Sequence, residues 1–163
     1  MKTLLIVFQS RTGGTRQMAE AAARGAAAEP QVQVRLLPAP EAQPEDVLAA
    51  DGYIFAAPEN LAAIAGLMKD FFDRCYYPAL DRIEGRPYAV LVCAGSDGQN
   101  AVRQIERIAT GWRLKAVMPA LIVCTHAQTP EDILRAKRIA DSDLARCSEI
   151  GAGLAAGLAL GVF

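Results

Sequence analysis

Four continuous apolar runs lie along the chain and are separated by more polar segments. Short uninterrupted runs are typical of strands that are buried on both faces of a parallel sheet. They comprise residues 4–8, 53–57, 88–93 and a stretch within 114–124. Residues 32–36 instead alternate apolar with polar side chains, which predicts a strand near an edge of the sheet. Pro58 is expected to end the third strand, and Pro119 to bend the last strand near its start.

Between the predicted strands, apolar positions recur at helical spacing. The expected helices cover residues 14–28, 44–50, 61–77 and 99–110, and a long final helix runs from about residue 130 to about residue 160. Gly111 is expected just beyond the end of the fourth helix. Thr129 is predicted to be the N-cap of the final helix, because Pro130 and Asp132 then occupy its first and third positions.

Each of the five predicted strands is followed by a helix. This alternation predicts an α/β fold, a doubly wound five-stranded parallel sheet with helices on both faces. The 163 residues suffice for one full-sized core, so we expect a single domain over residues 1–163. In the strand order 2-1-3-4-5, the loops after strands one, three and four meet at the carboxyl ends of the strands, where such sheets bind ligands. These loops are residues 9–15, 57–62 and 93–99.

The first of these loops has the sequence Ser10-Arg11-Thr12-Gly13-Gly14-Thr15 and is rich in hydroxyls and glycines. Such a loop directs free backbone N–H groups at one point, where the dipole of the following helix also favours negative charge. It lacks the lysine of a nucleoside-triphosphate loop, the glycine spacing of a dinucleotide fingerprint and the cysteine of a phosphatase. Gln9 and Ala57 stand where a phospho-receiver domain would have acidic residues. We therefore predict a site for a monoester phosphate; the alternative is an ordinary turn with Thr15 as N-cap.

Composition narrows the classes of function. Apolar residues make up 52% of the chain and aromatic residues 6%, so the core is built mainly from Ala, Leu, Ile and Val. A net charge of -1 and scattered Lys and Arg residues argue against binding to nucleic acid. The four cysteines show no C-x-x-C pair and no metal-ligand spacing, so we expect reduced thiols, a cytoplasmic protein and no metal site. The apolar run at residues 150–163 is too short to span a bilayer, and neither a membrane partner nor a signal peptide is expected.

The sequence S-R-T-G-G-T at residues 10–15 resembles the phosphate loop of flavodoxin-like FMN proteins, commonly [TS]-x-T-G-x-T. Residues 57–60 and 66–74 are similar to the second flavin loop, and the helix after it, of NAD(P)H-dependent flavin and quinone reductases. Residues 95–99, with 117–119 downstream, are similar to their third loop and final strand. The resemblance to this flavodoxin-like FMN-binding family covers nearly the whole chain. It implies a flavodoxin-like fold with FMN as cofactor.

The resemblance implies a site built from the three loops. Ser10, Thr12 and Thr15 would donate hydrogen bonds to the FMN phosphate, together with the backbone amides of residues 11–15. The other two loops would line the flavin ring, where short residues let the main chain approach a planar group closely. The residues implied in cofactor binding are Ser10, Arg11, Thr12, Gly13, Gly14 and Thr15; Pro58, Glu59, Asn60, Leu61 and Ala62; and Cys93, Ala94, Gly95, Ser96, Asp97 and Gly98.

The two ring loops contain no aromatic residue. Electron-carrying flavodoxins usually cover the ring with aromatic side chains and are strongly acidic, so an open ring and a net charge of -1 favour a reductase. We expect an FMN-containing oxidoreductase that passes reducing equivalents from NAD(P)H to a small acceptor such as a quinone or flavin. One alternative is a flavodoxin-type electron-transfer protein that is reduced by a protein partner. The other is a domain that has kept the fold and lost the cofactor.

His126, the single histidine, follows the last predicted strand and is the catalytic candidate. It would bond to a quinone oxygen or supply a proton, unless it is a surface residue of the loop. Tyr76, Tyr77 and Trp112 would either border the flavin or pack in the core or an interface. The final helix contains glycines at 151, 153, 157 and 161, which would favour close packing on the sheet or across a dimer. The sequence leaves a homo-oligomer open.

Overall fold

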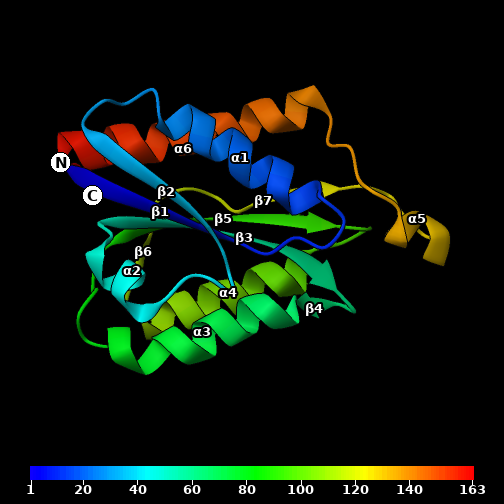
Figure 1. Cartoon of the computed structure of the whole chain (residues 1–163), viewed down its shortest axis with the longest axis horizontal. Coiled ribbons are helices and arrows are strands. Elements are labelled where there is room, and N and C mark those ends of the chain that lie inside the picture. The colour runs from blue at the N-terminus through cyan, green and yellow to red at the C-terminus, as the bar shows by residue number, and fades with distance from the viewer.

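The apolar runs form the strands of one central sheet (Figure 1). The computed structural model describes residues 1–163. The strands are β1 (Lys2–Phe8), β2 (Val32–Pro38), β3 (Gly52–Asn60), β4 (Ala63–Ile64), β5 (Pro87–Ala94), β6 (Lys115–Ala116) and β7 (Leu121–Cys124). Their order is β2-β1-β3-β5-β6, with β7 also pairing β5, and only the short β3–β4 pair is antiparallel. The predicted order 2-1-3-4-5 is confirmed, with β6 and β7 together in the place of the fifth strand.

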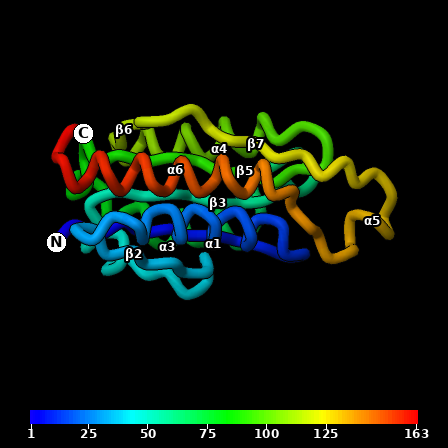
Figure 2. The backbone as a smooth tube through the Cα atoms, turned by 90° about the horizontal axis from the view of Figure 1, so that it is seen from above, coloured from blue at the N-terminus to red at the C-terminus, as the bar shows by residue number.

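Helices cover both faces of the sheet, as predicted (Figures 1 and 2). The helices are α1 (Gly14–Ala26), α2 (Pro44–Ala49), α3 (Gly66–Ala79), α4 (Gln99–Gly111), α5 (Pro130–Leu134) and α6 (Asp141–Leu160). One face carries α1 and α6, and the other carries α2, α3 and α4. The short helix α5 extends beyond the carboxyl ends of the strands. Crossing a bilayer would need a longer run of apolar helix than any of these elements provides.

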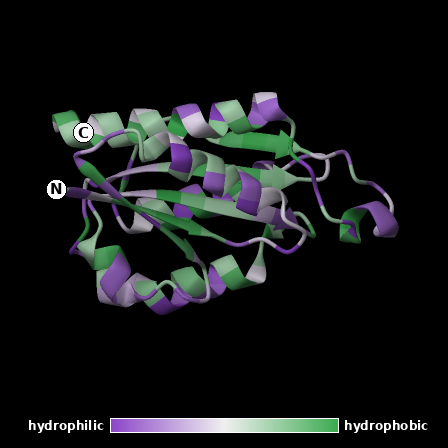
Figure 3. Ribbon diagram, turned by 45° about the horizontal axis from the view of Figure 1, so that its top comes forward, coloured by the Kyte–Doolittle hydropathy of each residue, from purple (hydrophilic) through white to green (hydrophobic).

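Two hydrophobic layers fill the space between the sheet and the helices. The layer under α3 and α4 contains the large aromatic side chains, among them Phe55, Phe71, Phe72 and Trp112, all less than 2% exposed. The layer under α1 and α6 is built from smaller residues such as Ala19, Ala22 and Ala155. Figure 3 shows that hydrophobic residues follow the strands and that polar residues lie on the outer sides of the helices. The alanine-rich first helix can therefore lie close to the sheet.

The glycines of α6 allow its backbone to touch that of α1. A Cβ added to Gly151 would lie 1.9 Å from the carbonyl oxygen of Ala22, and one added to Gly25 would lie 2.0 Å from that of Ser148. No other residue type fits at such separations. The sequence suggested that these glycines allow close packing on the sheet or across a dimer. Gly151 instead packs against Ala22 of α1, within the same chain.

Pro58 does not end the third strand, which continues to Asn60. In β3, the carbonyl of Ala56 points toward β1 and accepts the amide of Gln9 at 2.9 Å. Residues two apart in a parallel strand face the same neighbour, so Pro58 also faces the β1 side. The β1–β3 ladder stops at the Phe8–Ala56 pair, and the missing N–H of Pro58 therefore costs no hydrogen bond.

Three further element boundaries differ from the prediction. The third helix begins at Gly66 rather than at residue 61, because the hairpin to β4 uses the residues between. The last predicted strand is divided into β6 and β7 by residues 117–120, which include Pro119. Gly111 lies within α4, and the positive φ of 56° after this helix is at Arg113 instead.

The predicted final helix is also divided, into α5 and α6. Its predicted start is confirmed, since the Thr129 hydroxyl accepts the amide of Asp132 at 3.2 Å. Residues 135–140 are not helical because Lys137 and Ile139 direct backbone groups at residues near the start of the chain. We call residues 135–140 the strap.

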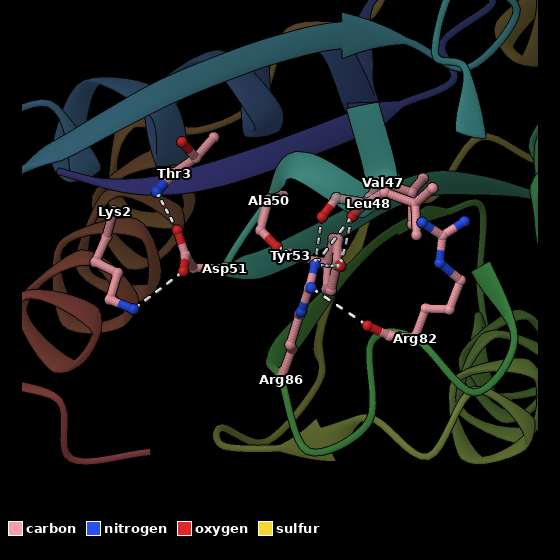
Figure 4. A network of polar contacts seen from close by, with 9 residues as sticks. All are labelled: Lys2, Thr3, Val47, Leu48, Ala50, Asp51, Tyr53, Arg82 and Arg86. Atoms are coloured by element: carbon pink, nitrogen blue, oxygen red, sulfur yellow. Dashed lines mark hydrogen bonds and ion pairs between the residues drawn. The ribbon is translucent and has the colours of Figure 1, made fainter. Parts of the chain in front are cut away.

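A network around Arg86 fastens α2 to the end of the sheet opposite the loops (Figure 4). The Arg86 guanidinium donates to the carbonyls of Leu48, at 2.9 Å, and Ala50, both at the C-terminal end of α2. It also reaches the hydroxyl of Tyr53 at 3.2 Å, and that hydroxyl donates to the carbonyl of Val47 at 2.7 Å. Burial raises the pKa of Tyr53 to about 12, so this phenol stays protonated as a donor at neutral pH.

Candidate functional site

The first loop, residues 10–15, connects β1 to α1 and presents polar groups at the start of the helix. Gly13 is the N-cap residue, with a φ of 92°, and its amide donates to the Ser10 hydroxyl oxygen at 3.2 Å. Thr15 lies inside the first turn, is 2% exposed and is the chain's one buried polar residue. It does not cap the helix, so the expectation that Thr15 would be the N-cap in an ordinary turn is wrong in its choice of residue. The first amides of α1 have no acceptor one turn earlier in the helix and remain available to an anion.

The strap packs against this first loop. The amide of Lys137 donates to the carbonyl of Thr12 at 2.8 Å. The Gln17 side chain bonds to the carbonyls of Gly13 and Lys137 and to the amide of Ile139. Lys137 directs its ammonium at the carbonyls of Asp132, Ile133 and Arg135, at the end of α5. Sequence reasoning missed the contacts between the strap and the first loop and α1, because they join residues about 120 positions apart and no local sequence pattern indicates them.

The second loop, residues 57–62, runs into a tight hairpin between β3 and β4. The hairpin comprises residues 59–64. Its central residues, Leu61 and Ala62, have φ values of 50° and 60°. Such turns usually contain Asn or Gly, because a Cβ makes positive φ unfavourable. The Leu61 side chain is fully exposed at the tip. This backbone strain at a loop that faces the candidate site is a feature that often accompanies function.

Helix α4 supports the hairpin. The Asn100 amide donates to the carbonyl of Ala62 at 2.6 Å, and the Gln104 side-chain oxygen accepts the amide of Ile64 at 2.7 Å. Both side chains come from the first half of α4, which follows the third loop, residues 93–98. Helix α4 therefore connects the hairpin to the third loop.

Glu59 joins the hairpin to the third loop. Its Oε1 accepts the amide of Gly98 at 3.0 Å. Gly98 has a φ of 86°, and an added Cβ would lie 2.8 Å from the Ile122 side chain, so this position requires glycine. The second carboxylate oxygen of Glu59, Oε2, is buried and has no hydrogen-bond partner. A buried acceptor without a donor is costly, and a ligand that brings an N–H or O–H group would satisfy it.

The side chain of Cys93, at the start of the third loop, lies against Gly14 of the first loop. Its Sγ would lie 2.8 Å from a Cβ added to Gly14. Burial raises the pKa of this thiol to about 11, so it is neutral at physiological pH. Cys93 therefore serves as packing behind the loop, and only its backbone can line a ligand on the other side.

His126 lies beside the third loop, as its place after the last strand predicted. Its backbone N–H donates to the carbonyl of Gly95 at 2.8 Å, and the residue has a φ of 59°. The imidazole is exposed and borders a cavity of about 380 Å³ between residues 123–127 and the strap. The structure thus places His126 at the same end of the sheet as the three loops.

No aromatic side chain belongs to the three loops. Trp112 is fully buried, stacks on Tyr76 at 5.7 Å with an interplanar angle of 15°, and donates its indole N–H to the carbonyl of Tyr76 at 2.9 Å. Tyr76 lies in the later turns of α3, and Trp112 directly follows the end of α4. Core packing is therefore correct for Trp112, and Tyr76 is partly buried against the same core layer. Tyr77 is 79% exposed.

Comparison with protein families identifies the family of the chain. Residues 38–129, more than half of the chain, match the family described as NADPH-dependent FMN reductase. The chain belongs to this family. The matched range contains the hairpin and the third loop, and it begins after the first loop. The expected flavoprotein family and its cofactor, FMN, are therefore confirmed.

Two curated relatives are similar in sequence to part of the chain. A flavodoxin of Aquifex aeolicus is 38% identical over 96 residues, which are 59% of this chain and 50% of that protein. An NAD(P)H dehydrogenase (quinone) of Acidithiobacillus ferrooxidans is 35% identical over 94 residues, and the match covers 45% of this chain and 47% of that protein. The chain spans about half the length of these curated relatives.

Solved structures extend the likeness of fold to the whole chain. An archaeal flavodoxin aligns with a TM-score of 0.79 and 18% identity, covering 96% of this chain and 98% of its own. A WrbA-like flavodoxin from Agrobacterium tumefaciens aligns with a TM-score of 0.74 and 19% identity, covering 99% of both chains. Identities this low establish the fold alone, and that fold is flavodoxin-like.

The loops have the chemistry that FMN requires. The first loop offers hydroxyls and free helix amides, which suit a phosphate monoester. The second and third loops offer short side chains, main-chain groups and the unpaired Glu59 Oε2, which suit the polar edge of a planar ring. The residues present therefore fit the cofactor of the family.

Proposed function

We propose that this protein is an FMN-dependent oxidoreductase that takes reducing equivalents from NAD(P)H and passes them to a small acceptor such as a quinone or a flavin. The observation that carries the proposal is a connected pair of loops without aromatic side chains beside a phosphate-type helix start. The buried aromatic residues that pack against one another, Tyr53, Phe55, Phe71, Phe72, Tyr88 and Trp112, lie in the core layer under α3 and α4. A flavin ring between these loops would keep one face open to a second planar molecule.

The first loop would hold the FMN phosphate. Ser10, Thr12 and the buried Thr15 supply hydroxyl donors, and the backbone amides of residues 11–15 supply the remaining donors. Arg11 is exposed at the rim, where its charge would attract the phosphate without a fixed hydrogen bond. The dipole of the 13-residue helix α1 adds to this attraction.

The other two loops would hold the ring. Residues 58–62 and 93–98 would supply backbone N–H and C=O groups to its polar edge. Glu59 would accept a hydrogen bond from a ring N–H on Oε2, while its Oε1 keeps the two loops joined through Gly98. Leu61 and Ala62 would place the apolar hairpin tip at the rim of the ring.

When bound, FMN supplies the hydride chemistry, and the protein supplies binding, orientation and the proton. His126 is the proposed proton source, because its exposed imidazole lies beside the third loop and an imidazole can both donate and accept a proton. From there it would donate to an acceptor oxygen. NAD(P)H and the acceptor would use the same open face in turn.

The proposal is tested with the whole chain, reconstituted with FMN and freed of oxygen. We expect NADPH or NADH to remove the visible absorbance of the bound flavin, and a quinone to restore it. The protein without FMN, given NADPH and quinone, is the control and should be inactive. An absorbance that stays unchanged with both nicotinamides would refute the reductase.

The second candidate is a flavodoxin-type electron carrier, which the flavodoxin relative favours. Such a protein would bind FMN but would not oxidise NADPH directly, and it would accept electrons from a protein reductase instead. A protein that binds no FMN after reconstitution would refute both candidates and favour a domain that has lost the cofactor.

A further inference from the structure

Gln17 makes contacts that neither the family match nor the proposed function assigns. It lies in the second turn of α1, and its side-chain amide is fully used. Nε2 donates to the carbonyls of Gly13 at 2.9 Å and Lys137 at 2.8 Å, and Oε1 accepts the amide of Ile139 at 3.1 Å. One side chain thus links the first loop to the strap, across 120 positions of sequence.

Gln17 and the strap together hold two peptide groups of the first loop in place. The carbonyl of Thr12 accepts the amide of Lys137, and the carbonyl of Gly13 accepts Gln17 Nε2. Because a peptide group is planar and trans, the N–H of the next residue points to the opposite side. The Thr12 carbonyl thus faces the strap, and the Gly13 amide points away from it, onto Ser10 Oγ at 3.2 Å. The Gly13 carbonyl accepts the backbone amide of Gln17 at 3.2 Å as the first hydrogen bond of α1, and Gln17 Nε2 adds a second bond that holds this peptide group with the Gly14 amide on its opposite side. Carbonyls that turned the other way would repel an anion.

The strap has few other ties to the body of the protein. Three hydrogen bonds join it to the first loop and α1, and two of them end on Gln17. Ile139 is its one buried residue, at 3% exposure, whereas Arg135, Ala136, Arg138 and Ala140 are exposed. The neighbouring helix α5 has no buried residue. The orientation of the strap against the loop thus depends chiefly on Gln17.

We propose that Gln17 is a positioning residue for the phosphate of the cofactor: by tying the strap to the first loop, it holds the loop in its anion-accepting conformation. This inference rests on the proposed FMN site and deepens it. Gln17 touches only loop and strap, so its effect should appear in affinity for the phosphate and not in affinity for the ring. Riboflavin, which has the same ring and no phosphate, separates the two.

The experiment compares the dissociation constants of FMN and riboflavin for the whole chain without cofactor, by quenching of flavin fluorescence. Gln17→Met keeps the length of the side chain and removes all three bonds. We expect the dissociation constant of FMN to rise about tenfold in this variant, and that of riboflavin to change by less than about twofold. Gln33→Met is the matched control, since Gln33 is exposed on β2, and it should change neither constant.

Gln17→Glu guards against loss of folding. It keeps an oxygen for the Ile139 amide and loses the two donors, but its negative charge also repels a phosphate, so we expect FMN to be weakened selectively at high salt as well as at low salt if lost positioning is the cause. Equal changes for FMN and riboflavin, or no change in either variant, would overturn the inference. A wild-type protein that binds neither flavin would instead refute the proposed function, so the two failures are distinguishable.

Discussion

Glu59 shows how one side chain can serve the fold and a ligand at the same time. Its Oε1 is fixed by the Gly98 amide, and this bond leaves Oε2 buried without a donor. Native proteins rarely leave such an oxygen unpaired, because its lost hydration is not replaced. The orphaned oxygen is therefore the residue-scale evidence that a donor from outside the chain belongs between the hairpin and the third loop.

Replacing Glu59 by Gln should weaken the binding of the flavin ring. The amide keeps one oxygen for Gly98 and presents an NH₂ group where the second carboxylate oxygen stood, so a ring N–H meets a donor. We expect the dissociation constants of FMN and riboflavin to rise together by about tenfold. Fluorescence titration of both flavins measures this.

Glu106→Gln is the control for the Glu59 variant, because it removes an exposed carboxylate from α4 without touching the loops. It should leave both flavin constants within about twofold of the wild type. A Glu59→Gln protein that binds riboflavin as tightly as the wild type would show that Oε2 does not face the ring.

Most elements of the fold could be predicted from local pattern, and the departures share one cause. The buried strands, α1, α2, α4 and the Thr129 cap follow from side chains within one element. The strap, the extension of β3 past Pro58 and the hairpin depend on partners elsewhere in the chain. The three loops could likewise be placed at one end of the sheet, but Gln17 and the free oxygen of Glu59 follow only from their partners in space.

The contact between α1 and α6 offers a test at the scale of the element. Gly151→Ala would push a Cβ to 1.9 Å from the Ala22 carbonyl, where only a shift of one helix relieves the clash. We expect this variant to lose about 2–3 kcal/mol of unfolding free energy. Gly153→Ala is the matched control, because its Cβ would meet only the flexible end of Met118, at 2.7 Å.

For Gly153→Ala, the gain in helix propensity offsets the contact, so its stability should stay within about 1 kcal/mol of the wild type. Urea unfolding at neutral pH measures both variants. Equal losses in the two would mean that any side chain on this stretch of α6 is harmful, and that the α1 contact is not the special feature. If Gly151→Ala had nearly the same free energy of unfolding as the wild type, the two helices could separate without loss of stability.

At the scale of the whole molecule, buried neutral acids set the response to alkaline pH. Burial raises the pKa of Cys75, Cys93 and Cys147 to about 11 each, from the 9.0 of an exposed thiol. These thiols lie on both faces of the sheet, in the two hydrophobic layers. Above pH 9 the unfolded chain loses their protons before the folded protein does. Ionisation therefore favours unfolding.

The sign follows from linkage: the unfolded state binds fewer protons in this window, so the free energy of unfolding falls as pH rises. The contribution of the three neutral thiols to the free energy of unfolding is fully present below about pH 9 and is lost as the pH approaches about 11. We expect urea midpoints, measured under reducing conditions, to fall steadily over this range. A variant with alanine at all three positions should start less stable, because of its cavities, and show a shallower fall. If the urea midpoint fell equally steeply with pH in the two proteins, other groups would cause the alkaline unfolding. Buried Tyr53, whose pKa is about 12, would then be the next candidate.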